Sequence, residues 1–172
     1  EEDTPLFAAV KGKKLDIIKI LLSSPNIDIN ASSIHNFNLL HSRREEIPAL
    51  YYATENGFSD IVQILASDNN ININSEYIQI MPYPPDHWHY FRNDLTETSL
   101  VVAARKGYNK IIQILLQHPN INPNYVNELH YKNDWEDEGE GMVLTSEKAS
   151  ALHVAVYKEK VDAVKILVEC PK

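Results

Sequence analysis

The segment Thr4-Pro5-Leu6-Phe7-Ala8-Ala9, followed by Ile17-Ile18-Lys19-Ile20-Leu21-Leu22, decides the fold because the chain repeats it. Related pairs of segments begin at Ala49, Ser99 and Ala151, so the 172-residue chain holds four copies. Three copies end on a similar Asn-rich turn, which reads Asn26-Ile27-Asp28-Ile29-Asn30 in the first copy. A self-similar period indicates a stacked array, in which each unit buries its apolar face only against its neighbours.

Each copy has the features of two short helices joined by a turn. Thr4 and Pro5 suit a helix start, because Thr can cap unpaired amide groups and Pro has no amide to lose at the first helical position. Three apolar residues within the range 6–10 then fall on one helical face. Asp16 opens the second helix, where an acidic residue suits the positive end of the helix dipole. The sequence therefore predicts a series of helix-turn-helix units.

These motifs resemble those of the ankyrin repeat family, whose units open on Thr-Pro-Leu-His-x-Ala. Thr4-Pro5-Leu6 and Leu152-His153-Val154-Ala155 carry the resemblance best. The resemblance implies an all-α ankyrin-repeat solenoid of helix-turn-helix units with long β-hairpin or loop fingers. It also implies a module that binds other proteins. The chain departs from the family pattern at Pro48, which replaces the capping Thr, and at Lys13 and Glu159, which replace Gly.

The spacing between copies is uneven and longer than in the family. The repeated Leu recurs after 44, 50 and 52 residues, whereas an ankyrin step is about 33 residues. We expect a single domain, part of a longer protein, with repeats at approximately 4–30, 48–74, 98–124 and 150–172 and finger inserts at 31–47, 75–97 and 125–149. All three inserts then project from one face, and insertions confined to one face often mark the binding face.

The second and third inserts contain aromatic residues of the types that anchor protein interfaces. The predicted partner-binding residues in these fingers are Tyr83, Trp88, Tyr90, Phe91 and Trp135. Ile78-Gln79-Ile80-Met81 alternates as a β-strand does. Two alternatives remain open: the loops simply tolerate added length, since loop closure costs little, or their aromatic side chains pack finger against finger.

The resemblance to ankyrin repeats places a second candidate surface at the ends of the first helices. In such arrays the two residues before the turn Gly line a concave groove, and here they are Lys11 and Gly12, Glu55 and Asn56, Arg105 and Lys106, and Tyr157 and Lys158. Arg105, Lys106 and Tyr157 are therefore predicted to be polar contacts to a partner. The alternative is an ordinary solvated helix surface.

The net charge of −8 lies entirely in the inserts, which hold 13 acidic and 5 basic residues, whereas the repeats hold 11 of each. Such fingers repel phosphates and anionic lipids. We therefore expect a protein partner with a basic or mixed surface, no nucleic acid and no direct membrane contact. Cys170 is the only cysteine, so the chain forms no internal disulfide and is compatible with a reducing compartment. We therefore expect an intracellular, cytoplasmic location. We also expect the chain to be monomeric in isolation.

The sequence predicts no enzyme, no catalytic residue, no metal and no cofactor. His87 and His89 would form half of a zinc site, but neither a Cys pair nor a second His cluster completes it nearby. Glu45 and Glu46 lack an evident dry pocket that would shift their pKa values, and His153 is expected to have a structural role. Other functions remain open: a structural spacer in a long ankyrin array, or the regulatory part of an enzyme or channel whose active domain lies outside this sequence.

Overall fold

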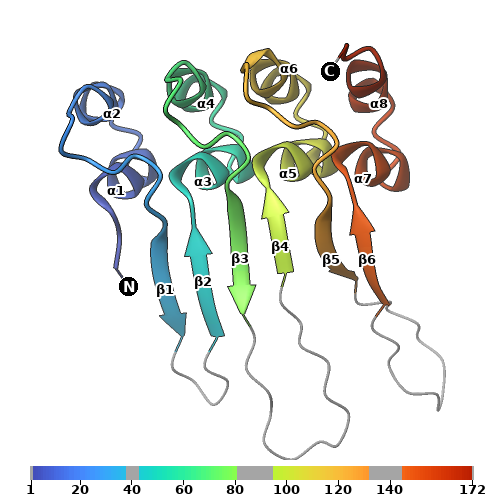
Figure 1. Cartoon of the computed structure of the whole chain (residues 1–172), viewed down its shortest axis with the longest axis horizontal. Helices are drawn as coiled ribbons and strands as arrows, with labels where there is room; N and C mark the ends of the chain where they lie inside the picture. The colour runs from blue at the N-terminus through green and yellow to red at the C-terminus, as the bar shows by residue number, and fades with distance from the viewer. Residues whose placement is uncertain (1, 38–42, 81–94, 132–144, 172) are drawn as a thin grey trace, which may run out of the picture.

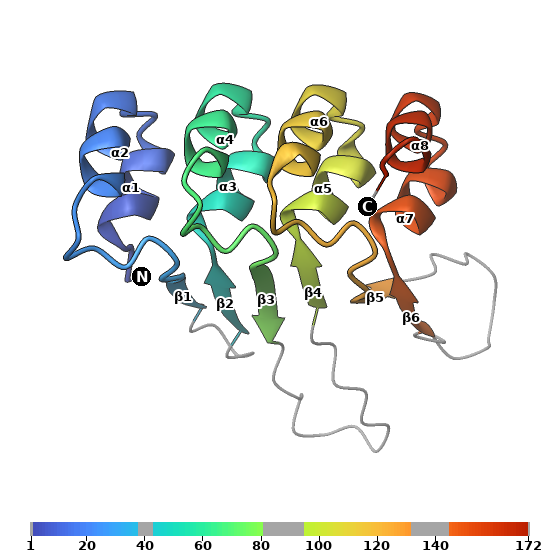
Figure 2. The same cartoon turned by 45° about the horizontal axis from the view of Figure 1, so that its top comes forward.

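The computed structural model describes residues 2–37, 43–80, 95–131 and 145–171, which contain four pairs of helices and three β-hairpins (Figure 1). The inner helices are α1 (Pro5–Lys11), α3 (Ala49–Glu55), α5 (Ser99–Lys106) and α7 (Ala151–Tyr157). The outer helices are α2 (Leu15–Leu22), α4 (Ser59–Ala66), α6 (Asn109–Gln117) and α8 (Val161–Val168). Successive pairs stack in chain order with the termini at opposite ends (Figures 1 and 2), which confirms the predicted solenoid.

The strands form three hairpins that extend to the same side of the inner helices (Figure 1). The strands β1 (Ser33–Phe37), β2 (Arg43–Ile47), β3 (Glu76–Ile80) and β4 (Leu95–Thr98) make one antiparallel sheet in that order. The strands β5 (Asn127–Tyr131) and β6 (Thr145–Ala149) pair separately. The strand expected around Ile78 is confirmed as β3, and its pairing with β2 joins the first two fingers.

Local features of the sequence explain where the helices begin. The Oγ1 atom of Thr4 accepts a hydrogen bond from the Phe7 N–H at 3.2 Å, and Pro5 follows at the first helical position. Lys110 replaces the acidic residue that opens the other outer helices, an unfavourable choice beside a helix N-terminus. Its ammonium lies 3.3 Å from an oxygen of Asp60 in the preceding repeat, so a contact between repeats offsets the local cost.

The turns within the four helix pairs have the same backbone path despite their different sequences. Gly57 and Gly107 take left-handed φ angles of 71° and 73°, and Lys13 and Glu159 take 52° and 54° at the corresponding places. In each repeat the residue at this place donates its N–H to a carbonyl three residues earlier. The two departures from the family pattern therefore leave the turn intact, at the cost of placing a side chain in the left-handed region.

An asparagine ladder ties the closing turns of neighbouring repeats. The Asn30 side chain donates to the carbonyl of Asn70 at 2.9 Å and accepts from the N–H of Asn72 at 2.6 Å. The Asn74 side chain repeats both contacts one step along, with the next turn. These bonds explain why three turns share an Asn-rich sequence, and they help to fix the outer edge of the stack.

Candidate functional site

The candidate site is the surface where the inner helices meet one face of the finger sheet. Alternate residues of a strand point to the same face, and on this face they are buried against the helices. The buried residues are polar as well as aromatic: His35, Glu45, Tyr77, Gln79 and Glu97. The sheet therefore presents an unusually polar face to the helix layer, and hydrogen bonds satisfy it.

Glu97 is the centre of the strongest contact across this surface. Its carboxylate accepts hydrogen bonds from Nε and Nη2 of Arg105, both at 2.9 Å, and a third from the Tyr51 hydroxyl at 2.8 Å. Only 3% of the Glu97 side chain is exposed. A bidentate Arg–carboxylate pair in such a setting fixes the plane of the guanidinium group as well as its position. Arg105 is thus held in one orientation along the inner face of α5.

Glu55, at the end of α3, links this pair to the preceding repeat. One oxygen lies 3.1 Å from Nη2 of Arg105 and the other lies 2.9 Å from Nζ of Lys106. No described residue is hydrogen-bonded to Nη1 of Arg105, although the guanidinium group carries donors on all three nitrogens. About a third of the Arg105 side chain is exposed, so part of the cluster borders solvent.

Burial and charge fix the protonation states within this cluster. Burial, followed by the negative charge of Glu97, raises the pKa of Tyr51 far above its ordinary value, which keeps the hydroxyl a hydrogen-bond donor. The hydrogen bonds to Glu97 raise the pKa of Arg105, which keeps the guanidinium charged. The cluster is therefore an ion pair with a neutral phenol at physiological pH.

Two further contacts continue the polar surface toward the first repeat. The Tyr77 ring stacks on Tyr51 with centroids 4.7 Å apart, and its hydroxyl donates to Glu45 at 2.8 Å. His35 Nε2 lies 2.8 Å from a carboxylate oxygen of Asp3. Burial alone would raise the pKa of Asp3, but the hydrogen bonds from His35 and Lys11 outweigh it and lower that pKa.

The structure separates the predicted groove residues into two groups. Arg105 and Lys106 belong to the cluster around Glu55 and Glu97. Tyr157, at the end of α7, has 65% of its surface exposed, and the Lys158 ammonium lies 5.0 Å from its ring centroid. The predicted finger residues lie outside the described part of the chain: Tyr83, Trp88, Tyr90, Phe91 and Trp135, together with His87 and His89.

Several residues of this surface were missed by reasoning from sequence. Glu45 is buried, although no pocket around it was evident from the sequence, because alternate residues of β2 face the helices and Tyr77 bonds its oxygen. Glu97 had no distinguishing mark among the acidic residues of the inserts. The one available signal was the alternation in β3, which places Tyr77 and Gln79 on the same face.

Two other expectations from the sequence concern helix ends. His153 Nδ1 lies 2.8 Å from the hydroxyl of Ser150, the N-cap residue that precedes α7, as expected for a structural role. Asn56, expected in the groove, donates its side-chain N–H to the Tyr52 carbonyl at 2.8 Å and so caps α3.

In the described ranges, no three His, Cys, Asp or Glu side chains come together as metal ligands. The described helices also include none with the length and hydropathy of a membrane span.

Comparisons with known proteins agree with this architecture. The family model for ankyrin repeats (three copies) matches residues 1–77 and 34–127. None of the curated proteins matches the chain, but solved structures do. The ankyrin repeat domain of Bcl-3, described as a unique member of the IkappaB protein family, aligns over 100% of this chain with a TM-score of 0.62 and 18% identity. An ankyrin repeat domain from Acinetobacter baumannii AYE aligns over 96% with a TM-score of 0.59 and 20% identity.

The chain spans 59% and 63% of the length of these two structures. At such identities the likeness concerns the fold alone. The family match covers most of the sequence, and the described chain repeats the same helix pair four times, with three hairpin fingers between the pairs. The chain belongs to the ankyrin repeat family.

Proposed function

We propose that this chain is a non-catalytic protein-recognition module that binds a segment of a partner protein along the inner helix ends and the adjoining fingers. Ankyrin repeat domains are generally protein-interaction modules. The partner contacts proposed on the described surface are Arg105, Lys106 and Tyr157. Tyr83, Trp88, Tyr90, Phe91 and Trp135 are the proposed apolar anchors in the fingers. The lone Cys170 fits action in a reducing, cytoplasmic compartment.

The observation that carries this proposal is the fixed Arg105 group. Its guanidinium is held by Glu97 and Glu55, yet described residues leave Nη1 without a hydrogen bond. A donor held before binding loses little conformational freedom when a partner arrives, so more of the contact energy appears as affinity. A backbone carbonyl or a carboxylate of the partner would be the natural acceptor.

The neighbouring residues suggest what kind of segment fits. Lys11, Glu55, Arg105 and Tyr157 occupy similar places near the ends of the four inner helices, so basic, acidic and aromatic groups follow one another along the stack. By sequence, the inserts also hold an excess of acidic residues. A partner segment of mixed charge, with basic residues toward the fingers, complements this arrangement, and long-range attraction would speed its association.

The proposal is tested with peptides selected from a random displayed library against the full chain. Binding is then measured for the double variant Lys106→Ala/Tyr157→Ala, which changes two partly exposed groove residues. We expect dissociation constants to rise by about tenfold or more, because Tyr is among the residue types that contribute most when a partner buries them, and a tenfold change corresponds to about 1.4 kcal/mol.

The matched control is Lys110→Ala/Lys165→Ala, which alters exposed side chains of the outer helices α6 and α8. Circular dichroism first establishes that both variants keep the wild-type helix content. The control should bind as the wild type does. If the groove variant retains full affinity, or if the control loses as much, the groove is not the recognition surface.

A further inference from the structure

The two carboxylates that contact Arg105 differ in how deeply they are buried. Glu97 accepts two hydrogen bonds from the guanidinium group, both at 2.9 Å, and 3% of its side chain is exposed. Glu55 lies 3.1 Å from one nitrogen of the same group, but 32% of its side chain is exposed. A buried, bidentate partner fixes a guanidinium group without further help. Glu55 is therefore not needed to orient Arg105, and its carboxylate lies where water can replace it.

Glu55 is also the one acidic residue among the eight predicted groove positions. These positions are Lys11, Gly12, Glu55, Asn56, Arg105, Lys106, Tyr157 and Lys158, so four of them are basic. Lys11 has an ion pair of its own with Asp3, at 3.3 Å. Without Glu55 the row would carry positive charge along the stack, and such a surface attracts acidic segments.

The Glu55 carboxylate bridges two cations of the next repeat. One oxygen lies 2.9 Å from Nζ of Lys106, and the other lies 3.1 Å from Nη2 of Arg105. Among the described residues, Lys106 forms no ion pair with another carboxylate. Both basic side chains are about a third exposed, and charged donors that converge in this way bind a carboxylate strongly. Glu55 thus occupies the place that a carboxylate of another protein would take.

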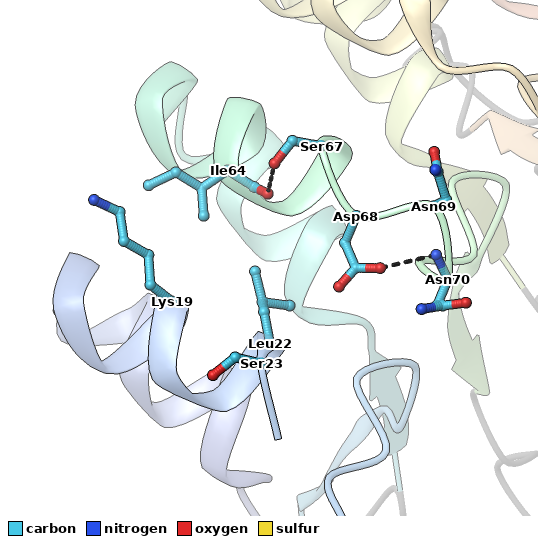
Figure 3. A pocket seen from close by; sticks show the side chains of 8 residues that line it. All are labelled: Lys19, Leu22, Ser23, Ile64, Ser67, Asp68, Asn69 and Asn70. Atoms are coloured by element: carbon cyan, nitrogen blue, oxygen red, sulfur yellow. Dashed lines mark hydrogen bonds between the residues drawn. The ribbon is translucent and has the colours of Figure 1, made fainter. Parts of the chain in front are cut away.

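Stacking of repeats does not by itself bring opposite charges together. At the first junction, Lys19 of α2 and Asp68, which follows α4, line an open cavity of about 530 Å³ between the outer helices (Figure 3). Asp68 instead accepts a hydrogen bond from the N–H of Asn70 in its own turn, at 2.9 Å, and no ion pair joins it to Lys19 in the part of the chain that the structure describes. The convergence on Glu55 is therefore a particular feature of the groove.

We propose that Glu55 is a built-in competitor for an acidic residue of the partner. On binding, the carboxylate of an Asp or Glu in the partner segment replaces Glu55 between Arg105 and Lys106. This inference rests on the proposed function, because it assigns a residue type to one position of the bound segment. A partly exposed ion pair contributes little to stability, so the release of Glu55 costs little, and Glu97 keeps the guanidinium group oriented throughout. A segment that lacks an acidic residue gains nothing from these two donors.

The test is a parallel selection of displayed peptides, from one random library, on the wild-type chain and on Glu55→Gln. The substitution removes the competing charge and keeps the size of the side chain, and circular dichroism checks the fold. Peptides from both selections should share an acidic residue. Each should bind Glu55→Gln up to about fivefold more tightly than the wild type, as expected for a partly exposed charge. The gain should fall as salt is added, because mobile ions screen the charges.

The matched control is Asp60→Asn, which also removes one negative charge. Asp60 forms the same kind of contact with the next repeat, 3.3 Å from Nζ of Lys110, but on the outer helices. Peptides should bind this variant as they bind the wild type. A gain equal to that of Glu55→Gln would overturn the inference, because net charge alone would then explain the effect.

Replacing the shared acidic residue of a peptide by its amide locates the partner carboxylate. The replacement should weaken binding to the wild type by up to about fivefold and should have a smaller effect on binding to Lys106→Met. Peptides that need Lys106 and Tyr157 but bind the wild type and Glu55→Gln equally would overturn this inference and leave the groove as the recognition surface. Peptides that bind Lys106→Ala/Tyr157→Ala as well as the wild type, or a library that yields no binder, would overturn the proposed function and this inference with it.

Discussion

Replacing Arg105 by Met should destabilise the fold more than any other change to the exposed charges of the groove. The substitution leaves the Glu97 carboxylate, of which 3% is exposed, with the Tyr51 hydroxyl as its one remaining hydrogen-bond donor among the described residues. An ionised carboxylate without a cation is costly in such a place, because burial removes most of its solvation.

The magnitude follows from the exposure of the two partners. Removing one member of a fully buried ion pair costs about 3 to 5 kcal/mol. The Arg105 side chain is about a third exposed, so water partly replaces it, and we expect a loss of about 2 kcal/mol in the free energy of unfolding. Lys106→Met, which breaks a more exposed pair with Glu55, should cost less than about 1 kcal/mol.

Urea unfolding followed by circular dichroism measures these differences. The double variant Glu97→Gln/Arg105→Met should recover to within about 1 kcal/mol of the wild type, because Gln carries no charge and its carbonyl still accepts from Tyr51. An Arg105→Met variant within about 0.5 kcal/mol of the wild type would show that the buried Glu97 carboxylate does not depend on this ion pair. So would a double variant that is less stable than the single one, since the isolated carboxylate would then not be the cause.

Three further predictions concern stability. Because burial and then the charge of Glu97 raise the pKa of Tyr51, the wild type loses stability as pH rises above about 10, where the unfolded tyrosine ionises. The difference in unfolding free energy between wild type and Tyr51→Phe should therefore shrink from about pH 9 to about pH 11, and a constant difference would contradict this. Glu159→Gly should raise the unfolding free energy by about 1 kcal/mol, because φ is 54° at this position and Gly adopts that angle without strain. Lys13→Gly should raise the unfolding free energy by less, because it also removes the contact between the Lys13 ammonium and the Phe58 ring. Thermal unfolding of the two variants measures this order. Asn74→Ala should cost about 1 to 2 kcal/mol in urea by removing two hydrogen bonds between turns. Asn124→Ala, whose side chain forms no such bridge among the described residues, is its control, and equal losses would rule out the ladder as the source.

Much of the fold could be predicted from the sequence because it depends on local, repeated patterns. The Leu and Ile periodicity marks the helices, Thr4 and Pro5 mark a helix start, and the uneven spacing places the fingers on one side of the stack. These signals lie within a few residues of one another, so a single sequence carries them.

The groove cluster could not be predicted, because it joins residues that are distant in sequence. Tyr51 and Glu97 are 46 positions apart and Glu55 and Arg105 are 50 apart, and they meet only when two repeats stack with the correct register. The pairing of β2 with β3 is also a consequence of stacking and has no motif of its own. Arg105 could be placed in the groove by the family resemblance, but the resemblance did not identify the carboxylates that hold it.

Hydrogen exchange of the full chain, with and without a selected peptide, tests the central claim that the inner helix ends form the recognition surface. We expect slower amide exchange on binding in the segments that surround Arg105 and Tyr157, together with β3 and β4, while α6 and α8 exchange as before. Protection confined to the outer helices, with none near Arg105, would contradict it.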